Sequence, residues 1–440
     1  MAGVENLVAK LAMTRIAIIG GGYAGMAAAV SLAQRSVAVT VFESAKQLGG
    51  RARGVNYQNT QLDNGQHLLL GCYRETLRLI ELVGGNIEQD FVRFPLQLEL
   101  HQQFSLKAPN LPAPLHLLVA FVQAKGLSWA DRLKAARFMV RLQRAKFRLE
   151  KLQRGMTDCT VAELLERYGQ TGELTLKLWE PLCIAALNTP IALASAQVLL
   201  NVLRDSLNQT RADSDMLLPR LDFTALFPQR AAQYVEAHGG KVHLACGVES
   251  LRSVENGFEL VTAQGTEYFD KVICATSPSI AARLLRDTLD VSLIAALPQQ
   301  PIYTVYLQYP AECRLPTSML GLHQCTSQWL FDKGQIAGQH GLIASVISAE
   351  GLHQDLTQDQ LAQAVAAELQ QKFAFPDAPV WYKVIAEKRA TFSCNAHLAR
   401  PDQRTAVPNL FLAGDYTAGD YPATLEGAVM SGVKCGNLTI

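Results

Sequence analysis

The apolar positions near the start of the chain form two short runs separated by a helical stretch. Residues 16–19 are all apolar and lead into a glycine-rich turn, an Ala-rich helical pattern follows, and the second run, residues 37–42, ends at Glu43. Short continuous apolar runs on either side of a helix are typical of parallel strands that are buried on both faces. The order strand, glycine turn, helix, strand, acid therefore predicts a βαβ unit.

The pattern predicts alternating helices and strands along the rest of the chain. The expected strands cover residues 57–62, 242–244, 302–308, 342–348 and 409–413, with a meander over 254–275; the expected helices cover 68–85, 129–154, 181–203, 225–238 and 359–372, with a last helix beginning at Thr424. The return to short strands after residue 250 suggests a second visit to the first domain. Residues 291–400 mix strands with a helix, which suits a second layer in a separate domain.

The glycines of the first turn have the spacing of a dinucleotide fingerprint. Gly20 allows the tight turn, Gly22 lets a pyrophosphate approach the backbone, and Gly25 lets the helix pack closely on the strand. The start of the helix offers free N–H groups to phosphates. Glu43 lies where a carboxylate can accept both ribose hydroxyls. These features predict a dinucleotide site, and the structural alternative is a βαβ unit whose glycines serve packing alone.

Two further segments favour FAD over NAD. Gly50 and Arg51 follow the acid, where a guanidinium can reach the phosphates of a longer dinucleotide. Near the C-terminus a strand ends at Gly414 and Asp415, and the helix start at Thr424 could face the flavin ring and favour the negative charge of a reduced flavin. We recognise no second dinucleotide fingerprint after a strand, so we expect no nicotinamide domain. The electrons would then come from an external donor.

Composition excludes several classes of function. The 440 residues carry a formal net charge of +1, which gives no general attraction to nucleic acid. The nine cysteines form no CxxC pair and the histidines no HExxH, so we expect reduced thiols in a cytoplasmic protein and no metal site. Residues 1–13 contain Glu5 and Lys10 within a short apolar stretch, and we expect no signal peptide there.

The middle of the chain suggests contact with apolar material. Nine basic residues and only two acids lie in the predicted helix 129–154, beside an apolar, proline-broken stretch over 111–118. This arrangement favours docking on an anionic membrane surface, and the alternative is a solvated helix face. Residues 181–203 are uncharged, but Asn188, Pro190 and Gln197 interrupt them, so we expect an interior helix along an apolar cavity and not a membrane span.

Several blocks of the chain resemble the amine oxidase and phytoene desaturase superfamily of FAD enzymes. They are residues 20–25, Glu43, Gly49-Gly50-Arg51 and residues 410–432. Residues 62–76, 178–190 and 419–432 further resemble hydroxysqualene dehydroxylases. The resemblance implies an α/β fold, with a Rossmann-like, GR2-type, discontinuous FAD-binding domain and an interleaved α+β substrate domain that includes a helical membrane-facing subregion. We expect the FAD domain over residues 14–95, 205–290 and 404–440, and the substrate domain over 96–204 and 291–403.

The same resemblance implies a reaction and its residues. The enzyme would remove the hydroxyl of hydroxysqualene, a C30 isoprenoid alcohol, and leave squalene, using electrons from NAD(P)H or a reductase, at the inner membrane of a bacterium that makes hopanoids. Gly20, Gly22, Gly25, Glu43, Gly50, Arg51, Gly414, Asp415, Thr424, Leu425 and Ala428 would bind FAD, and Asn188, Tyr421 and Pro422 would line the substrate pocket. His67 and Glu426 are the candidate acids.

Alternatives remain open at this stage. A carotenoid-precursor desaturase would use the same fold with electrons flowing in the opposite direction. Rab GDP-dissociation inhibitors share the architecture as lipid carriers without flavin, although the intact Gly50, Arg51, Gly414 and Asp415 argue against that class. His67 follows a polar turn that either reaches the flavin or lies on the surface.

Overall fold

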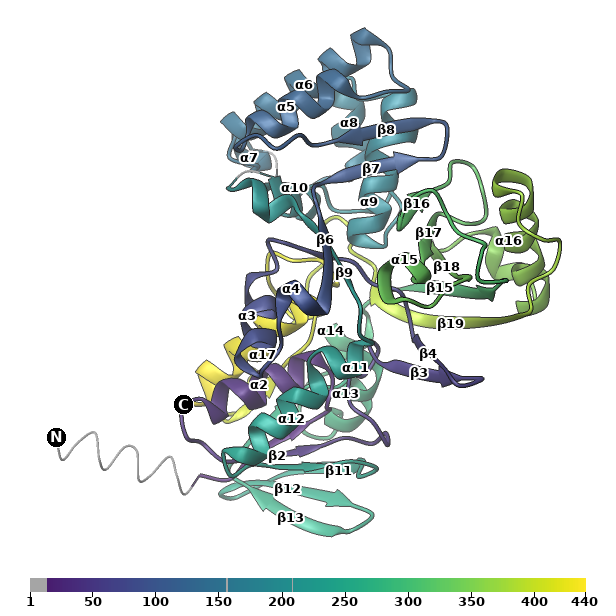
Figure 1. Ribbon diagram of the computed structural model, residues 1–440. Helices are drawn as coiled ribbons and strands as arrows, with labels where there is room; N and C mark the ends of the chain where they lie inside the picture. Colours follow the sequence, from purple (N-terminus) through teal and green to yellow (C-terminus); the bar gives the residue numbers. More distant parts are fainter. Residues whose placement is uncertain (1–13, 156, 208) are drawn as a thin grey trace.

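The computed structural model describes residues 14–155, 157–207 and 209–440. Figure 1 shows three regions stacked around a centre: a parallel-sheet region that contains the C-terminus, a second sheet region to one side, and a helical region at the far end. The expectation for residues 1–13 lies outside the described residues.

The first region is built on a five-stranded sheet in which every pairing is parallel. Its strand order is β10-β2-β1-β14-β20. The strands are β1 (Ile16–Ile19), β2 (Val39–Phe42), β10 (Lys241–His243), β14 (Lys271–Cys274) and β20 (Leu410–Leu412). The chain thus returns to one sheet from widely separated segments, as the strands after residue 250 suggested.

Both faces of this sheet are covered, which explains why β1 is apolar at every position. Ile16 and Ile18 pack with α2 (Tyr23–Ala33) and α12 (Pro228–Ala237). Ala17 and Ile19 pack on the other side, in the core that contains the antiparallel sheet β11 (Val248–Val254), β12 (Gly257–Thr262) and β13 (Gly265–Phe269). Every residue of α2 is buried, and α17 (Leu425–Thr439) lies against it.

The contact between α2 and α17 depends on glycine. A Cβ added to Gly432 would lie 2.1 Å from the carbonyl oxygen of Ala24. No other residue permits this approach without moving a helix. The close contact fixes where the C-terminal helix begins.

The second region contains a mixed seven-stranded sheet. Its order is β19-β15-β18-β17-β16-β7-β8. The strands are β7 (Gln97–Leu100), β8 (Phe104–Lys107), β15 (Gln299–Gln308), β16 (Met319–Gly321), β17 (Trp329–Asp332), β18 (Leu342–Ser348) and β19 (Trp381–Phe392), with α15 (Lys333–Ala337) and α16 (Gln358–Phe373) beside them. All these strands fall inside the ranges predicted for the substrate domain, whose exact boundaries stay a prediction.

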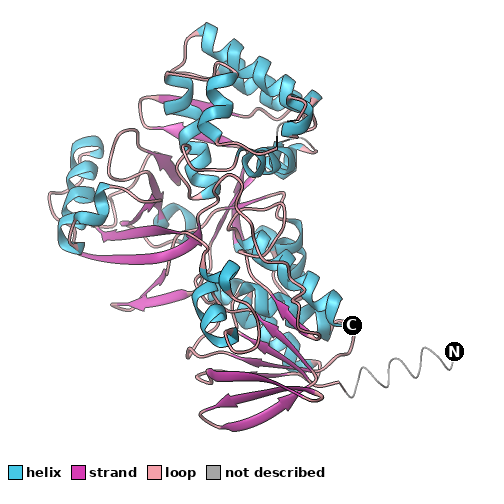
Figure 2. Cartoon of the chain, turned by 180° about the vertical axis from the view of Figure 1, so that it is seen from behind, coloured by secondary structure: helices cyan, strands magenta, loops and turns pink. Residues whose placement is uncertain are grey.

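The third region is helical and stands at the top of Figure 1. It consists of α5 (Leu115–Gln123), α6 (Trp129–Arg144), α7 (Leu149–Leu152), α8 (Val161–Arg167), the π-helical turn Thr175–Trp179, α9 (Glu180–Leu187) and α10 (Ala196–Leu207). The view from behind shows the same three regions joined by long connections through the centre (Figure 2). Within the described residues, no helix combines the length and apolar character needed to cross a bilayer.

Smaller elements join these regions. They are the hairpin β3 (Gly54–Tyr57) and β4 (Thr60–Asp63), the sheet β5 (Leu69–Leu70), β9 (Met216–Pro219) and β6 (Phe91–Phe94), and the helices α3 (Arg74–Leu82), α4 (Ile87–Asp90), α11 (Phe223–Leu226), α13 (Pro278–Leu285) and α14 (Ser292–Ala295).

The structure corrects four expected elements. The strand expected over 57–62 is a hairpin, because Gln58 and Asn59 both adopt positive φ in its two-residue turn. The helix expected over 68–85 is β5 followed by α3. The helix expected over 129–154 is interrupted between α6 and α7, where Lys146 and Phe147 have positive φ and Phe147 is buried.

The fourth correction concerns the uncharged stretch 181–203, which forms two helices instead of one. Asn188 adopts a left-handed conformation at the end of α9, and α10 begins at Ala196. Most of α10 is buried, whereas in α9 only Cys183 and Leu187 are, and residues of both helices line the central cavity, as the sequence led us to expect.

Candidate functional site

A cavity of about 1410 Å³ runs through the centre of the molecule, between the three regions. Its lower part is lined by the glycine turn after β1 and by the segments after β2 and β20. Its upper part is lined by apolar side chains of the second sheet and the helical region, including Leu98, Leu117, Phe121, Met139, Leu182 and Phe331. Drug-sized ligands fill cavities of about 300–1,000 Å³, so this cavity has room for more than one such molecule.

The glycine turn at the lower end leaves the backbone open to the cavity. Gly20 has φ +109°, and a Cβ there would lie 2.7 Å from the carbonyl oxygen of Ala275. A Cβ on Gly22 would meet nothing closer than Gly50, at 3.8 Å. No side chain caps the first turn of α2, which begins at the cavity with Tyr23 and Ala24. Uncapped N–H groups at the start of an 11-residue helix suit a phosphate.

Glu43 lies beside this turn with its carboxylate oriented by backbone. One oxygen accepts from Gly21 N at 2.7 Å and the other from Ala45 N at 2.8 Å. The side chain is 8% exposed and lines the cavity. A carboxylate has further acceptor positions after two such bonds. Glu43 can therefore accept hydrogen bonds from hydroxyl groups of a ligand.

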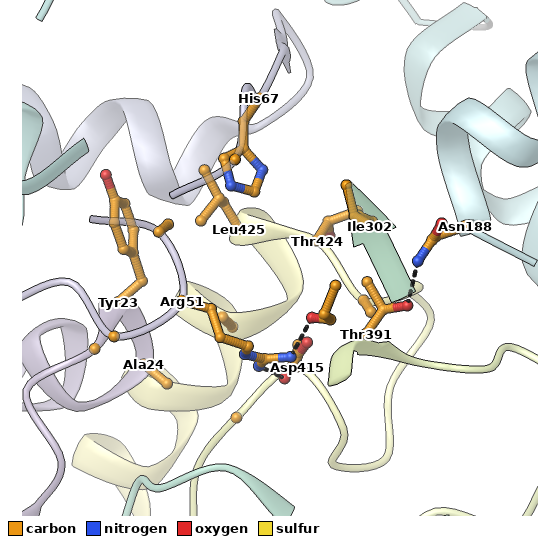
Figure 3. Close-up of a pocket in the computed structure, with 18 of the residues that line it drawn as sticks. Tyr23, Ala24, Arg51, His67, Asn188, Ile302, Thr391, Asp415, Thr424 and Leu425 are labelled. Carbon is orange, nitrogen blue, oxygen red and sulfur yellow. Dashed lines mark hydrogen bonds and ion pairs between the residues drawn. The ribbon is translucent and has the colours of Figure 1, made fainter. Parts of the chain in front are cut away.

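Arg51 and Asp415 face each other across the cavity floor. Nη2 of Arg51 lies 2.6 Å from Oδ1 of Asp415, and Nη1 donates to the carbonyl oxygen of Ala390 at 2.6 Å. Gly50, Gly414, Leu425 and Ala428 also line this part of the cavity. Figure 3 shows Arg51 and Asp415 on facing segments, with Thr424 and Leu425 nearby. The pair joins the N-terminal and C-terminal segments at the site.

His67 lines the cavity and is not on the outer surface of a turn. Its ring packs edge-on against Phe223, with ring centroids 4.9 Å apart. Burial and, to a smaller extent, the nearby Arg51 guanidinium lower the pKa of His67 to about 4. The imidazole is therefore neutral at pH 7, and a neutral imidazole is a poor proton donor to an alcohol.

The structure corrects the expectation that Glu426 faces the reacting group. Its carboxylate accepts hydrogen bonds from Glu75 N, Thr76 N and Thr76 Oγ1 at 2.7–3.0 Å, at the start of α3. Glu426 is 2% exposed and is not among the residues that line the cavity. It therefore caps a helix behind the wall.

Three other predicted residues occupy structural positions. Gly25 lies outside the cavity wall, and a Cβ there would stand 1.9 Å from the carbonyl oxygen of Gly20, so this glycine serves close packing of helix on strand. Pro422 is also outside the wall. Asn188 lines the cavity, but its amide group bonds to Thr391 Oγ1, the Pro301 carbonyl and Ala349 N (Figure 3).

Four further polar residues lie in the wall: Asn64, Gln66, Tyr73 and Asp205. The sequence pointed to Asn64 and Gln66 only as members of the polar turn before His67, and it gave no role to Tyr73 and Asp205. Gln66 accepts a hydrogen bond from the buried Lys333 at 3.1 Å, and Lys333 also lies 3.8 Å from Asp63. Burial raises the pKa of Asp63 to about 6, although the Lys333 charge opposes this shift. These contacts join residues too far apart in sequence for a motif to reveal them.

The residues present fit a bound dinucleotide. The uncapped start of α2, the open glycine turn and the acceptor positions of Glu43 match phosphates and ribose hydroxyls, and the cavity continues past them to Arg51, Asp415 and Thr424. Among the described residues, no group of three or more His, Cys, Asp or Glu side chains could hold a metal ion.

Comparison with known proteins gives one matching family model, described as flavin containing amine oxidoreductase, over residues 23–436. The chain is 28% identical to hydroxysqualene dehydroxylase of Rhodopseudomonas palustris, over 96% of this chain and 97% of that protein. It is 26% identical to hydroxysqualene dehydroxylase of Zymomonas mobilis, over 96% and 98%. It is 25% identical to zeta-carotene desaturase of Zea mays, over 95% and 82%.

Solved structures share the fold. An engineered putrescine oxidase superposes with a TM-score of 0.74 at 16% identity, over 96% of this chain and 98% of that chain. Cyclohexylamine oxidase from Brevibacterium oxydans superposes with a TM-score of 0.69 at 17% identity, over 97% of both chains. At these identities the likeness supports the architecture and not a substrate.

The Arg51 side chain gives a test of the lower cavity. We expect Arg51→Ala to weaken FAD binding tenfold or more, because a charge-assisted hydrogen bond from the guanidinium to a cofactor phosphate would contribute about 1.5–3 kcal/mol, and without Arg51 the Asp415 carboxylate would repel that phosphate. The ratio of flavin to protein absorbance after gel filtration, and FAD titration of the flavin-free protein, measure the effect. The control is Arg35→Ala, at an exposed arginine that bonds Asn437. Unchanged FAD affinity in Arg51→Ala would contradict the assignment of Arg51 to the FAD site.

The lowered pKa of His67 predicts a pH-dependent stability. Between pH 6.5 and 4 the unfolded chain binds a proton at this residue and the folded protein does not, so His67 lowers the stability as the pH falls. From pH 7 to pH 4, wild type should lose about 3 kcal/mol more free energy of unfolding than His67→Gln. Urea unfolding of flavin-free protein across this range measures the difference. Parallel pH profiles for the two proteins would show that His67 titrates normally.

Proposed function

The chain belongs to the family of flavin-containing amine oxidoreductases and is an FAD-dependent oxidoreductase, and within this family we propose that it converts hydroxysqualene to squalene. The observation that carries the proposal is the cavity, whose apolar upper part runs from the segments around Arg51 and Asp415 into the helical region. The similarity of the chain to hydroxysqualene dehydroxylases, over nearly its full length, supports the same substrate.

We assign the lower cavity to FAD by its chemistry. In this proposal Gly20, Gly22 and the start of α2 bind the pyrophosphate, and Glu43 binds the ribose of the adenosine. Gly50, Arg51, Gly414 and Asp415 bind the central part of the cofactor. Thr424, Leu425 and Ala428 contact the ring. Gly25 supports this site through packing and not through contact.

The protein's own part in the reaction is to position the alcohol and to exclude water. A reduced flavin supplies hydride when it is bound. The apolar walls formed by Leu117, Phe121 and Met139 keep water from a carbon that is losing its hydroxyl, which water would otherwise recapture. They also hold the long chain in one orientation, which lowers the entropic part of the barrier. An outside donor, NAD(P)H or a reductase, would supply the electrons.

We also propose that α5 and α6 dock on an anionic membrane. Leu115, Val122, Trp129 and Leu133, which we call the α5–α6 tip, are 49–70% exposed. Arg132 stacks over Trp129 at 4.7 Å and donates to the Val122 carbonyl, so these residues lie together. The same segment carries one acid, Asp131, and exposed bases along its length: Lys125, Lys134, Arg137, Arg141 and Arg144.

This surface would suit the substrate, because the opposite faces of the same helices line the cavity through Leu117, Phe121 and Met139. A bilayer-soluble alcohol could then enter between the helices without crossing water. Apolar side chains among bases are typical of interfacial helices.

A second candidate function is desaturation of a carotenoid precursor. The observation that favours it is the similarity to zeta-carotene desaturases over 95% of the chain. It needs the same apolar cavity, and the electrons would leave the substrate instead of entering it. The family match argues against the third alternative, a lipid carrier without flavin.

The decisive experiment is anaerobic incubation of the chemically reduced holoenzyme with hydroxysqualene. We expect squalene by mass analysis, formed in proportion to the flavin that becomes oxidised. Oxidised enzyme without a donor serves as the control and should give none. Absence of squalene, together with turnover of an apolar polyene by oxidised enzyme, would favour the desaturase.

Membrane docking predicts that the protein sediments with vesicles that contain anionic phospholipid. Replacing both Trp129 and Leu133 by Ser should weaken binding about tenfold or more, because each side chain would lose about 1.5–3 kcal/mol of burial. Added salt should also weaken it, through screening of the bases. The matched control replaces Leu352 and Val380, which are 87% and 71% exposed and lie outside the helical region. Equal binding of both variants would contradict docking through this tip.

A further inference from the structure

One part of the cavity wall brings two tyrosines and an aspartate together. Tyr73, Asp205 and Tyr421 meet there, and we call them the polar corner. Tyr73 immediately precedes α3, Asp205 lies near the end of α10, and Tyr421 belongs to the loop before α17. The corner therefore lies where the helical region meets the C-terminal segment. That segment also contributes Thr424 and Leu425 to the wall.

The tyrosines of this corner are held by hydrogen bonds. Tyr421 is hydrogen-bonded to Asp205, and Tyr73 to Thr424. Burial raises the pKa of both tyrosines, and nearby acidic groups raise it further. Both phenols are therefore neutral. Since a phenol that donates to a carboxylate keeps its oxygen lone pairs, Tyr421 can still accept a hydrogen bond from a ligand hydroxyl.

Acidic side chains outnumber basic ones around the corner. Asp205 and Glu426 act on Tyr421. The bases close by are Arg204 and Arg400, which donates to the Tyr421 carbonyl oxygen at 2.9 Å. Arg204 binds Asp205 through two hydrogen bonds, at 2.6 and 3.0 Å, but it is shared with Asp420 at 3.2 Å. Behind the wall, the Glu426 carboxylate is paired only with neutral donors of α3. The thiol of Cys72, which also lines the cavity, has a pKa raised to about 12 by burial and then by Glu426, Asp205 and Asp213.

Other polar groups in the wall have different surroundings. His67 lies near the Arg51 guanidinium, whose positive charge opposes a second positive charge. The amide of Asn188 is fully engaged by Thr391, Pro301 and Ala349. The polar corner is thus the part of the wall that combines two aromatic rings, hydrogen-bonding groups and a carboxylate, that of Asp205.

We propose that the polar corner binds the hydroxyl-bearing carbon of the substrate and stabilises the positive charge that develops there. This inference rests on the proposed dehydroxylation. In that reaction the C–O bond breaks, the oxygen takes up a proton that comes from solvent and leaves as water, and a bound reduced flavin would supply the hydride whose two electrons neutralise the carbon. Aromatic faces and a nearby carboxylate both favour a cation in an otherwise apolar site.

The test measures binding of two probes to the FAD-loaded protein. One is a tertiary amine built on a long isoprenoid chain, which carries a positive charge at neutral pH, and the other is squalene. Changes in flavin absorbance and in tryptophan fluorescence report binding, because Trp179 and Trp329 line the cavity. We expect the wild type to bind the amine about tenfold more tightly than squalene, which corresponds to about 1.4 kcal/mol.

Variants test whether the polar corner causes the tighter binding of the amine. Asp205→Asn should bring the ratio of the two affinities close to one. Tyr421→Phe should weaken binding of hydroxysqualene, titrated in the same way as a third ligand, without weakening that of squalene. The matched control is Asp420→Asn, because Asp420 shares Arg204 but is 65% exposed and lies outside the wall. It should keep the wild-type ratio. In turnover, Asp205→Asn should lower kcat more than it raises KM.

The outcomes separate the two proposals. If Asp205→Asn binds squalene normally and keeps the tenfold preference for the amine, the polar corner does not stabilise the charge, and the inference is wrong while the proposed function stands. If the wild type binds neither probe, or if it oxidises the amine with reduction of its flavin, the proposed function itself is wrong. Normal squalene binding by each variant also shows that it is folded.

Discussion

The site depends on the return of the C-terminal strand to the sheet that the first strand begins. β20 pairs with β14 in parallel, and β14 pairs with β1. Because carboxyl ends of parallel strands lie at one edge of a sheet, this pairing brings the turn after β1 and the Gly414-Asp415 turn to the same place. The tight contact of Gly432 with Ala24 and the ion pair of Arg51 with Asp415 then hold the two segments together.

Most residues that the sequence singled out for the lower half of the site lie together in the cavity wall, because the pattern that named them is local. A glycine turn, a helix start and an acid are close in the chain, so their spacing determines their arrangement. The strands 16–19 and 342–348 were predicted at their exact bounds, since continuous burial on both faces leaves a clear pattern. Elements were missed where a short backbone feature decided the outcome: the positive φ of Gln58 and Asn59 makes a hairpin, and that of Asn188 divides a helix.

The upper half could not be predicted in the same way. Tyr73, Asp205 and Tyr421 meet only because α3, α10 and the loop before α17 converge, and no spacing in the chain records that. The two predicted acids show the same limit. Both lie in segments close to the cavity, but side-chain direction decided their surroundings: Glu426 turns to the start of α3, and His67 lies near a guanidinium. Motifs locate segments, whereas tertiary contacts set the charge of each group.

The size of the cavity has a consequence for the folding of the protein. A space of about 1410 Å³ at the junction of three regions is a gap in what would otherwise be one continuous core. A cofactor bound there would pack against side chains of all three regions. A ligand that binds only the folded chain stabilises it by mass action, in proportion to the logarithm of its free concentration. Bound FAD would thus hold the three regions together, and the free energy of unfolding would rise with its concentration.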